Sequence, residues 1–118
     1  MFDFENLIVY QKAKAFNRAV QELQAGQNFD KSVRDQLRRA SLSIQLNIAE
    51  GSGKFTSSDR CKFLIIARGS VYESISLLES LLDEKQIDAA VYREFYGKGE
   101  EISKILFAMI RNLKEGRV

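Results

Sequence analysis

The chain has 118 residues, of which 45% are hydrophobic, and a net charge of +2 at neutral pH. This length suits a single domain with one hydrophobic core, and the ordinary charged and aromatic content excludes an intrinsically disordered chain. Histidine is absent and Cys61 is the only cysteine, which excludes an internal disulfide and a histidine–cysteine zinc cluster. Proline is also absent, which favours an all-α fold because proline breaks helix interiors.

Hydrophobic periodicity predicts four helices in a single domain of residues 1–118, over residues 4–24, 30–50, 57–83 and 89–114. We expect Asp3 to cap the first helix and Gly26 to mark the break after it. The apolar residues of this helix share one broad face at helical spacing: Ile8, Ala15, Phe16, Ala19, Val20 and Leu23.

The second segment contains SLSIQLNIAEG, residues 41–51, in which apolar residues alternate one by one. Alternation is typical of a half-buried strand, but the preceding DQLRRA has no turn residue and is rich in helix formers. We therefore expect a helix that begins after a capping Asp30 and ends at Gly51. Its apolar residues then form two stripes, one with Val33, Leu37, Ala40, Ile44 and Ile48, the other with Leu42, Leu46 and Ala49.

A helix with two apolar stripes must bury both of them. One stripe is expected to face the core of the bundle, and a second subunit is the simplest cover for the other. A loop or a neighbouring helix of the same chain is the alternative cover. The third helix carries a lesser second stripe, so the candidate oligomer interface comprises Leu42, Leu46, Ala49, Ile65 and Tyr72.

The fourth segment follows Asp88 and keeps apolar residues at helical spacing from Phe95 to Leu113. Gly97 and Gly99 interrupt it, which predicts either a kink or a close approach to a neighbouring helix. Four helices of this length with short connections predict an antiparallel up-and-down four-helix bundle.

A polar stripe lies between the two apolar stripes of the second segment and consists of Arg39, Ser43, Asn47 and Glu50. Buried polar groups need hydrogen-bond partners. Ser70 and Glu73 share a face of the third helix, where Glu73 could pair with Arg39. We expect these six residues to form a network that fixes helix register or a subunit contact. A binding site is the alternative.

Charge is distributed unevenly along the chain. Eight basic residues oppose four acidic ones between Asp30 and Ser70, whereas three basic residues oppose eight acidic ones between Val71 and Glu101. The basic segment permits an anionic partner, and a solvated surface of mixed charge is the alternative. The candidate nucleic-acid-binding residues are Arg34, Arg38, Lys54, Arg60, Lys62 and Arg68. The rotational symmetry of an oligomer would bring the positive charges of several subunits together. These residues are accompanied by no RRM, KH or zinc-knuckle pattern.

No group of residues indicates catalysis. The stretch EGSGKF resembles a phosphate-binding loop, but Ile48 and Phe55 stand where that loop needs its first glycine and its hydroxyl residue. Cys61 has no histidine to activate it. We therefore expect a protein that is not an enzyme, with no metal, cofactor or small-molecule substrate. No apolar run is long enough for a membrane span, and the lone cysteine favours a cytoplasmic location.

Three stretches carry a resemblance to a known family: QLRRASLSIQLNIAEGSGK, FLIIARGSVYES and the opening FENLIVYQKA. Together they are similar to the bacterial 23S rRNA-intervening-sequence protein family. The resemblance implies a four-helix bundle that assembles into a ring, typically a homopentamer, and implies no catalytic residues. Members of this family are encoded inside intervening sequences of 23S rRNA genes. A related branch is an accessory factor that works with a reverse transcriptase and nucleic acid.

These inferences favour a non-enzymatic oligomeric bundle protein that associates with RNA or a ribonucleoprotein through a basic surface. The alternative is a protein–protein interaction module, such as an accessory factor for a nucleic-acid enzyme, that does not bind RNA directly.

Overall fold

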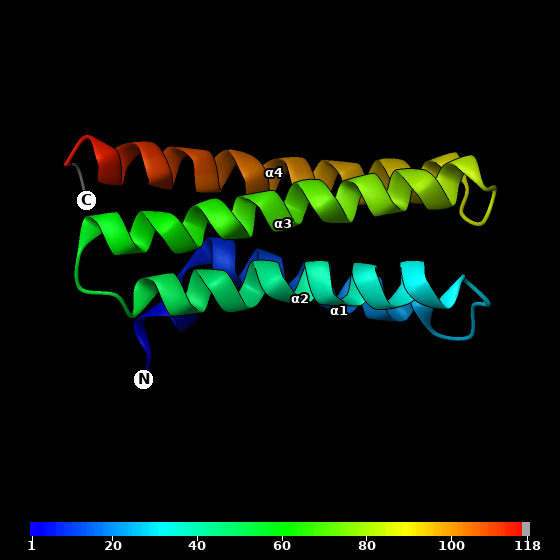
Figure 1. The fold of residues 1–118 in the computed structure, drawn as a ribbon, viewed down its shortest axis with the longest axis horizontal. Coiled ribbons are helices and arrows are strands. Elements are labelled where there is room, and N and C mark those ends of the chain that lie inside the picture. The colour runs from blue at the N-terminus through cyan, green and yellow to red at the C-terminus, as the bar shows by residue number, and fades with distance from the viewer. Residues whose placement is uncertain (117–118) are drawn as a thin grey trace.

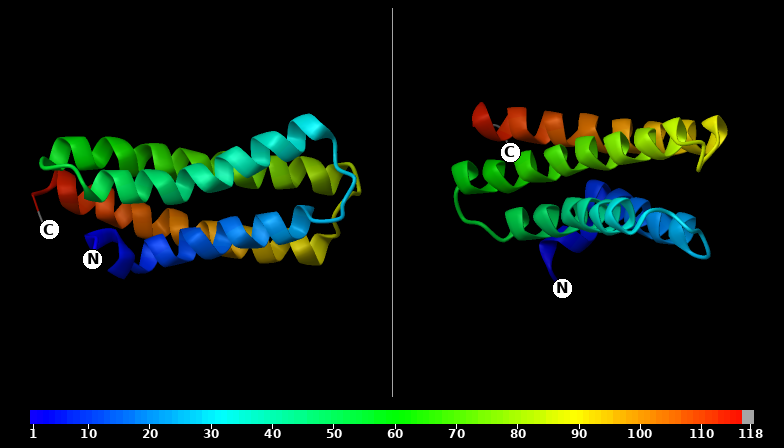
Figure 2. Two further views of the ribbon diagram at one scale, coloured as in Figure 1. Left: turned by 90° about the horizontal axis from the view of Figure 1, so that it is seen from below. Right: turned by 45° about the vertical axis from the view of Figure 1, so that its right-hand side comes forward.

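The computed structural model describes residues 1–116, which form four α-helices and a short 3-10 helix with no strand (Figure 1). In chain order the elements are η1 (Asp3–Asn6), α1 (Ile8–Gln24), α2 (Lys31–Ser52), α3 (Ser57–Asp83) and α4 (Ala89–Lys114). Successive helices run antiparallel, with α1 and α2 in one layer and α3 and α4 in the other (Figures 1 and 2). The predicted all-α, four-helix fold is confirmed.

Polar side chains determine where three of the helices begin. Asp30, Thr56 and Asp88 each accept hydrogen bonds of 2.8–3.3 Å from backbone N–H groups two or three residues further along the chain. Each such bond satisfies an N–H group that has no partner inside the helix and contributes about 1 kcal/mol to helix stability. The cap at Asp30 is the one that the sequence predicted for α2, and Asp88 is the residue after which the fourth helix was expected to begin.

The end of α3 is closed by a backbone motif instead. The N–H groups of Lys85 and Gln86 donate to the carbonyl groups of Leu82 and Leu81, both at 2.9 Å. Lys85 has a left-handed backbone with a φ of 59°. This arrangement is a Schellman motif, in which glycine is the usual residue at the left-handed position because it has no Cβ.

The first helix differs from its prediction at its start. Asp3 does not cap α1 but begins η1, and α1 begins at Ile8 without a side-chain cap. Ile8 is 65% exposed and Ala15 is exposed, whereas Val9 and Ala13 are buried in the core. The predicted inner face was therefore wrong at these positions. Ile8 and Val9 are adjacent apolar residues, so helical spacing alone allows either of them to face the core. Packing against the other helices determines which one does.

The predicted end of α2 was wrong for a related reason. Gly51 lies buried inside the helix, and Gly53 is the residue that caps it. A Cβ atom added at Gly51 would lie 3.1 Å from the Cβ of Phe63 and 3.4 Å from the carbonyl oxygen of Arg60. The glycine therefore allows α2 and α3 to approach closely where the chain passes from one layer to the other.

All four helices contribute to one continuous core, in which the rings of Phe16 on α1 and Phe95 on α4 pack edge to face with centroids 5.7 Å apart. The first apolar stripe of α2 is buried here, as its Leu37 and Ile44 are fully enclosed. Helices α1 and α4 pack against each other less extensively than the other neighbouring pairs. No helix within residues 1–116 has the combined length and apolarity that a membrane span requires.

The two glycines of α4 have different surroundings. A Cβ atom at Gly99 would lie 2.8 Å from the Cδ1 atom of Ile75 on α3, so this glycine marks a close approach of the two helices. A Cβ atom at Gly97 would meet nothing within 4 Å. Of the two possibilities that the sequence left open, the structure therefore supports close approach, at Gly99 alone.

Candidate functional site

Three of the six residues predicted to form a polar network meet between α2 and α3. The side-chain amide of Asn47 donates to the backbone carbonyl of Ser43 at 2.8 Å and to its hydroxyl at 2.9 Å. The hydroxyl of Ser70 donates to the hydroxyl of Ser43 at 2.9 Å. Because the Ser70–Ser43 bond joins two helices, it favours a single register between them. These groups are neutral and satisfy one another's hydrogen bonds.

The charged residues of the predicted network lie outside this contact. Arg39, Glu50 and Glu73 are exposed, and Glu50 forms an ion pair with Lys54 at 3.8 Å. Within residues 1–116 no ion pair joins Arg39 to Glu73, so the pairing considered from the sequence was wrong. Arg39 instead presents its charge on the outer surface of α2, where a partner can reach it.

Two of the six candidate phosphate-binding residues are bound to backbone carbonyls. The guanidinium of Arg34 donates to the carbonyl oxygens of Gln24, at 3.2 Å, and Gln27, and so holds the α1–α2 connection against α2. The Nε atom of Arg60 donates to the carbonyl oxygen of Lys54 at 2.7 Å and holds the α2–α3 connection in the same way. Charge reversal at either residue would disturb a connection between helices as well as a surface charge.

Two further candidates lie over aromatic rings. The Nζ atom of Lys54 is 4.9 Å from the ring centroid of Phe63. The guanidinium of Arg68 lies over both Tyr72 and Phe107, at 4.9 and 5.5 Å, and donates to the hydroxyl of Tyr72 at 2.9 Å. Such contacts orient a cation without neutralising it, so the charge of Arg68 is still able to attract an anion, whereas Lys54 is also paired with Glu50 at 3.8 Å.

Arg38 and Lys62 are the two exposed candidates, and Lys62 forms a long ion pair of 3.8 Å with Asp59. Arg38 lies about a third of the way along α2, and Lys62 lies in the second turn of α3. Because Gly51 near the end of α2 packs against Phe63, the 13 residues from Arg38 to Gly51 separate Arg38 and Lys62 along the bundle by about 20 Å. One chain therefore does not gather the six basic residues into a single patch.

The second apolar stripe of α2 is at the surface, with Leu42 37% and Leu46 52% exposed and Ala49 half-buried. The same holds for the second stripe of α3, where Ile65 is 48% and Tyr72 is 58% exposed. No loop or helix of the described chain covers either stripe. Isolated exposed apolar residues are ordinary, but several on one helix face indicate an association surface.

A groove of about 460 Å³ runs along the outer side of α3 and α4, and we call it the α3–α4 groove. Its walls include three tyrosines and Arg68, whose Nε atom is buried without a hydrogen-bond partner in residues 1–116. Burial raises the pKa of Tyr92 in this groove, and the nearby carboxylate of Glu79 adds to the effect. The residues that line the middle of the groove are Arg68, Tyr72, Ile75, Tyr92, Tyr96 and Gly99.

Two exposed apolar residues were not predicted from the sequence, Ile66 on α3 and Phe107 on α4, which are 50% and 53% exposed. Phe107 belongs to the side of α4 that meets Arg68, and its signal in the sequence was its position one residue after the buried Leu106. Neighbouring residues on a helix point in different directions, so both cannot face the core.

Two features relevant to chemistry can be described, the distribution of potential metal ligands and the position of the lone thiol. Residues 1–116 contain no cluster of three or more His, Cys, Asp or Glu side chains that could hold a metal ion. The thiol of Cys61 is buried, and its Sγ atom lies 3.8 Å from the carbonyl oxygen of Ile110. A thiol in this position packs in the core and is shielded from a substrate.

The model of one protein family, the 23S rRNA-intervening sequence proteins, matches residues 5–108. The chain belongs to this family. A solved structure with a similar fold is a protein with unknown function from the S23 ribosomal protein family of Bacteroides thetaiotaomicron VPI-5482. The two chains are 24% identical, with a TM-score of 0.82 over 87% of this chain and 98% of the other. No curated protein matches the chain. The family resemblance read from the sequence is therefore confirmed, and the solved relative supports the fold.

Proposed function

We propose that this protein is a non-enzymatic, cytoplasmic homo-oligomer, a ring of five chains, that associates with RNA or a ribonucleoprotein. The observation that carries the proposal is the outer face of α2, which we define by Arg38, Arg39, Leu42 and Leu46. All four side chains are exposed, and the two arginines have no ion-pair partner in residues 1–116. Exposed guanidinium groups are suited to bind phosphate.

Assembly supplies what one chain lacks. The exposed leucines of α2 give a second subunit an apolar surface to cover, and rotational symmetry would repeat each basic side chain around the ring. Arg38 and Lys62, which are separated along one bundle, would then form two rings of positive charge. Membership of a family named for intervening sequences of 23S rRNA supports RNA as the anionic partner.

The test of RNA association is fluorescence anisotropy of the purified protein with structured ribosomal RNA across a salt series. Contacts to phosphate predict an affinity that falls steeply with salt. The double variant Arg38→Glu and Lys62→Glu should weaken binding and reduce the slope of log affinity against log salt by roughly 0.7–0.9 for each phosphate that the variant no longer binds. Arg34 and Arg60 are unsuitable for this test because they hold helix connections.

The matched control is Arg93→Glu, which changes an exposed arginine within the acidic part of the chain on α4. It should leave the affinity within about twofold of the unaltered protein, since it lies outside the basic segment. Absence of binding at low salt, or equal losses in the control and the double variant, would remove the RNA proposal.

Assembly is tested separately by the native mass of Leu46→Asp. A buried aspartate without a partner in the interface should produce monomers. Gln36→Asp places the same charge on an exposed polar position of α2 and should leave the mass unchanged. If Leu46→Asp keeps the native mass of the unaltered protein, the α2 stripe is not the subunit interface.

A protein partner is the second candidate, and the α3–α4 groove favours it. Tyrosine and arginine are enriched among the residues that contribute most to protein–protein binding, and this groove contains Tyr72, Tyr92, Tyr96 and Arg68. In that case the bundle would serve as an accessory factor for another protein. Loss of a protein partner in Tyr96→Ala, together with unchanged RNA affinity, would support this function over the first.

A further inference from the structure

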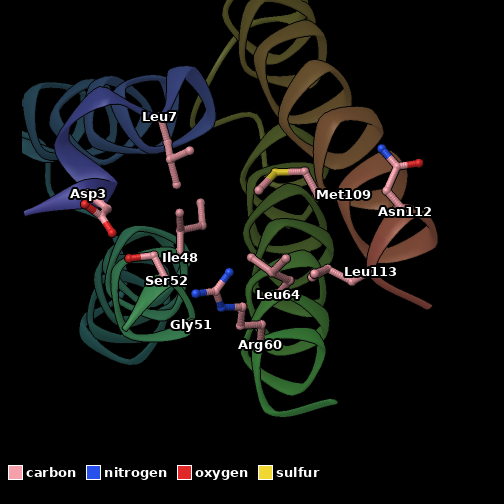
Figure 3. A pocket seen from close by; sticks show the side chains of 10 residues that line it. All are labelled: Asp3, Leu7, Ile48, Gly51, Ser52, Arg60, Leu64, Met109, Asn112 and Leu113. Carbon is pink, nitrogen blue, oxygen red and sulfur yellow. The ribbon is translucent and has the colours of Figure 1, made fainter. Parts of the chain in front are cut away.

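A second concavity lies at the end of the bundle where η1, the last turn of α2, the first turns of α3 and the end of α4 meet. It has a volume of about 320 Å³. Figure 3 shows the side chains of Leu7, Ile48, Leu64 and Met109 directed toward the space between them. At this end η1 packs on α1 and α2, and residues of α3 and α4 supply the remaining walls. Its volume is at the lower end of the range for sites that bind small molecules.

Among residues 1–116, Arg60 is the one basic residue that lines this cavity. Arg60 is held by the bond from its Nε atom to the carbonyl oxygen of Lys54, at 2.7 Å. Its two terminal amino groups have no hydrogen-bond acceptor within residues 1–116, and Figure 3 shows the guanidinium turned toward Ile48 and Gly51 at the cavity wall. An oriented guanidinium with two free nitrogen atoms matches the geometry of a carboxylate, which binds it through two parallel hydrogen bonds.

The remaining polar groups limit the charge of the ligand. Asp3 is the only acidic residue of the lining, and its carboxylate lies beside Ser52 (Figure 3). It would repel a second negative charge in a cavity of this size. A single arginine opposed by an aspartate therefore suits one carboxylate group and disfavours a nucleotide or another ligand with several charges.

We propose that this end cavity binds a small amphipathic monocarboxylate, such as a medium-chain fatty acid. The apolar chain lies among Leu7, Ile48, Leu64 and Met109, and the carboxylate accepts hydrogen bonds from Arg60. This site is separate from the proposed RNA association and does not depend on it. It gives Arg60 a role in ligand recognition in place of phosphate binding.

The two methionines of the chain allow a direct test. Met109 lines the cavity, whereas Met1 is 97% exposed and lies outside it. Protein labelled with [methyl-13C]methionine therefore gives one signal from the site and one internal control. Titration with decanoate, below the concentration at which it forms micelles, should shift the Met109 signal to saturation and leave the Met1 signal in place. Decanol, which lacks the carboxylate, should bind at least about tenfold more weakly.

Arg60→Gln should reduce decanoate affinity by about tenfold or more, because it removes the charged donor. Lys62→Gln is the matched control on the same helix, with an exposed side chain outside the lining, and should leave the affinity within about twofold. If Arg60→Gln does not fold, Leu113→Phe decides the question, since it fills the cavity and should abolish the Met109 shift.

Each contrary result overturns the proposal. No saturable shift of Met109 would mean that the cavity is closed or covered by another subunit. Parallel shifts of both methionines would mean unspecific binding. Equal affinities for decanoate and decanol, or an unchanged affinity in Arg60→Gln, would remove the carboxylate–arginine contact. None of these readouts involves RNA, so the proposed function can fail while this one stands.

Discussion

The two glycines of α4 allow a test of how closely α3 and α4 pack. Replacement of a helical glycine by alanine stabilises a helix by about 1 kcal/mol when the new methyl group meets nothing. Gly97 has nothing within 4 Å of an added Cβ atom, so Gly97→Ala should raise the free energy of unfolding by about 0.5–1 kcal/mol. The same substitution at Gly99 brings the same gain in helix stability but adds a steric clash with α3.

The size of that collision follows from the structure. A Cβ atom at Gly99 would lie 2.8 and 3.1 Å from the Cδ1 and Cγ1 atoms of Ile75 and 3.4 Å from the Cγ1 atom of Val71. Overpacking of this kind costs about 1–3 kcal/mol. After subtraction of the helix-forming gain, Gly99→Ala should lower the free energy of unfolding by about 0–2 kcal/mol. The two variants should therefore differ by roughly 1–3 kcal/mol.

Urea unfolding followed by circular dichroism measures this difference. The variants must be compared at one protein concentration, since association between subunits contributes to apparent stability. The reasoning would be refuted if Gly99→Ala stabilised the protein as much as Gly97→Ala. That result would mean that Ile75 moves aside at no cost and that the close approach of the helices does not depend on the glycine.

Three further outcomes follow from individual side chains. Arg34→Ala should lower the free energy of unfolding by about 1–3 kcal/mol in urea titrations, since two loop carbonyls lose a charged donor, whereas the exposed Arg38→Ala should change it by less than about 0.5 kcal/mol. Lys85 has a left-handed backbone, which costs a residue with a Cβ atom about 1 kcal/mol. Lys85→Gly removes this cost and should raise the midpoint of thermal unfolding. Burial and Glu79 raise the pKa of Tyr92 above 10.0, so its contribution to stability is complete below pH 10 and is lost as the pH rises through the folded-state pKa. Tyr92→Phe should remove a phase of tyrosinate absorbance that appears above pH 10 on alkaline titration.

The helices were predictable because their signals are local. Asp30, Thr56 and Asp88 each precede a periodic apolar segment, and each forms a cap through neighbouring backbone atoms. The alternation in residues 41–51 was also resolved correctly as two stripes, because Ile44 and Ile48 are buried while Leu42 and Leu46 are exposed. Spacing on a helix determines which residues share a face.

The misjudged positions depend on neighbours that are distant in sequence. A glycine near the end of a helix indicates either a cap or a close approach, and the proximity of Phe63 to Gly51 decides for the second. At the start of α1, the ring of Phe4 packs against that of Tyr10 with centroids 4.7 Å apart, which favours a short 3-10 helix before α1. Neither contact can be read from local periodicity.

In the candidate sites too, helical spacing predicted which residues share a face but not which groups their side chains contact. Helical spacing placed Ser43 and Asn47 on one face, and they do meet Ser70. Spacing could not show what the end of a long side chain binds, so Arg34 and Arg60 were counted as surface charges although both hold backbone carbonyls. The end cavity left no pattern in the sequence, because its lining comes from four separate elements.

The light packing between α1 and α4 has a consequence for motion in the native state. Where these helices meet, an exposed ion pair of 2.7 Å joins Lys12 to Glu101, and exposed ion pairs contribute at most about 1 kcal/mol. Phe16 and Phe95 also pack across this seam, but because it is less extensive than the other helix contacts we expect it to open locally at a lower free energy than global unfolding requires. Amide hydrogens of the first turns of α1 should exchange with solvent before those of α2 and α3. Fluctuation along this one seam would give the interior of the bundle a route to solvent while the remaining helix pairs stay closed.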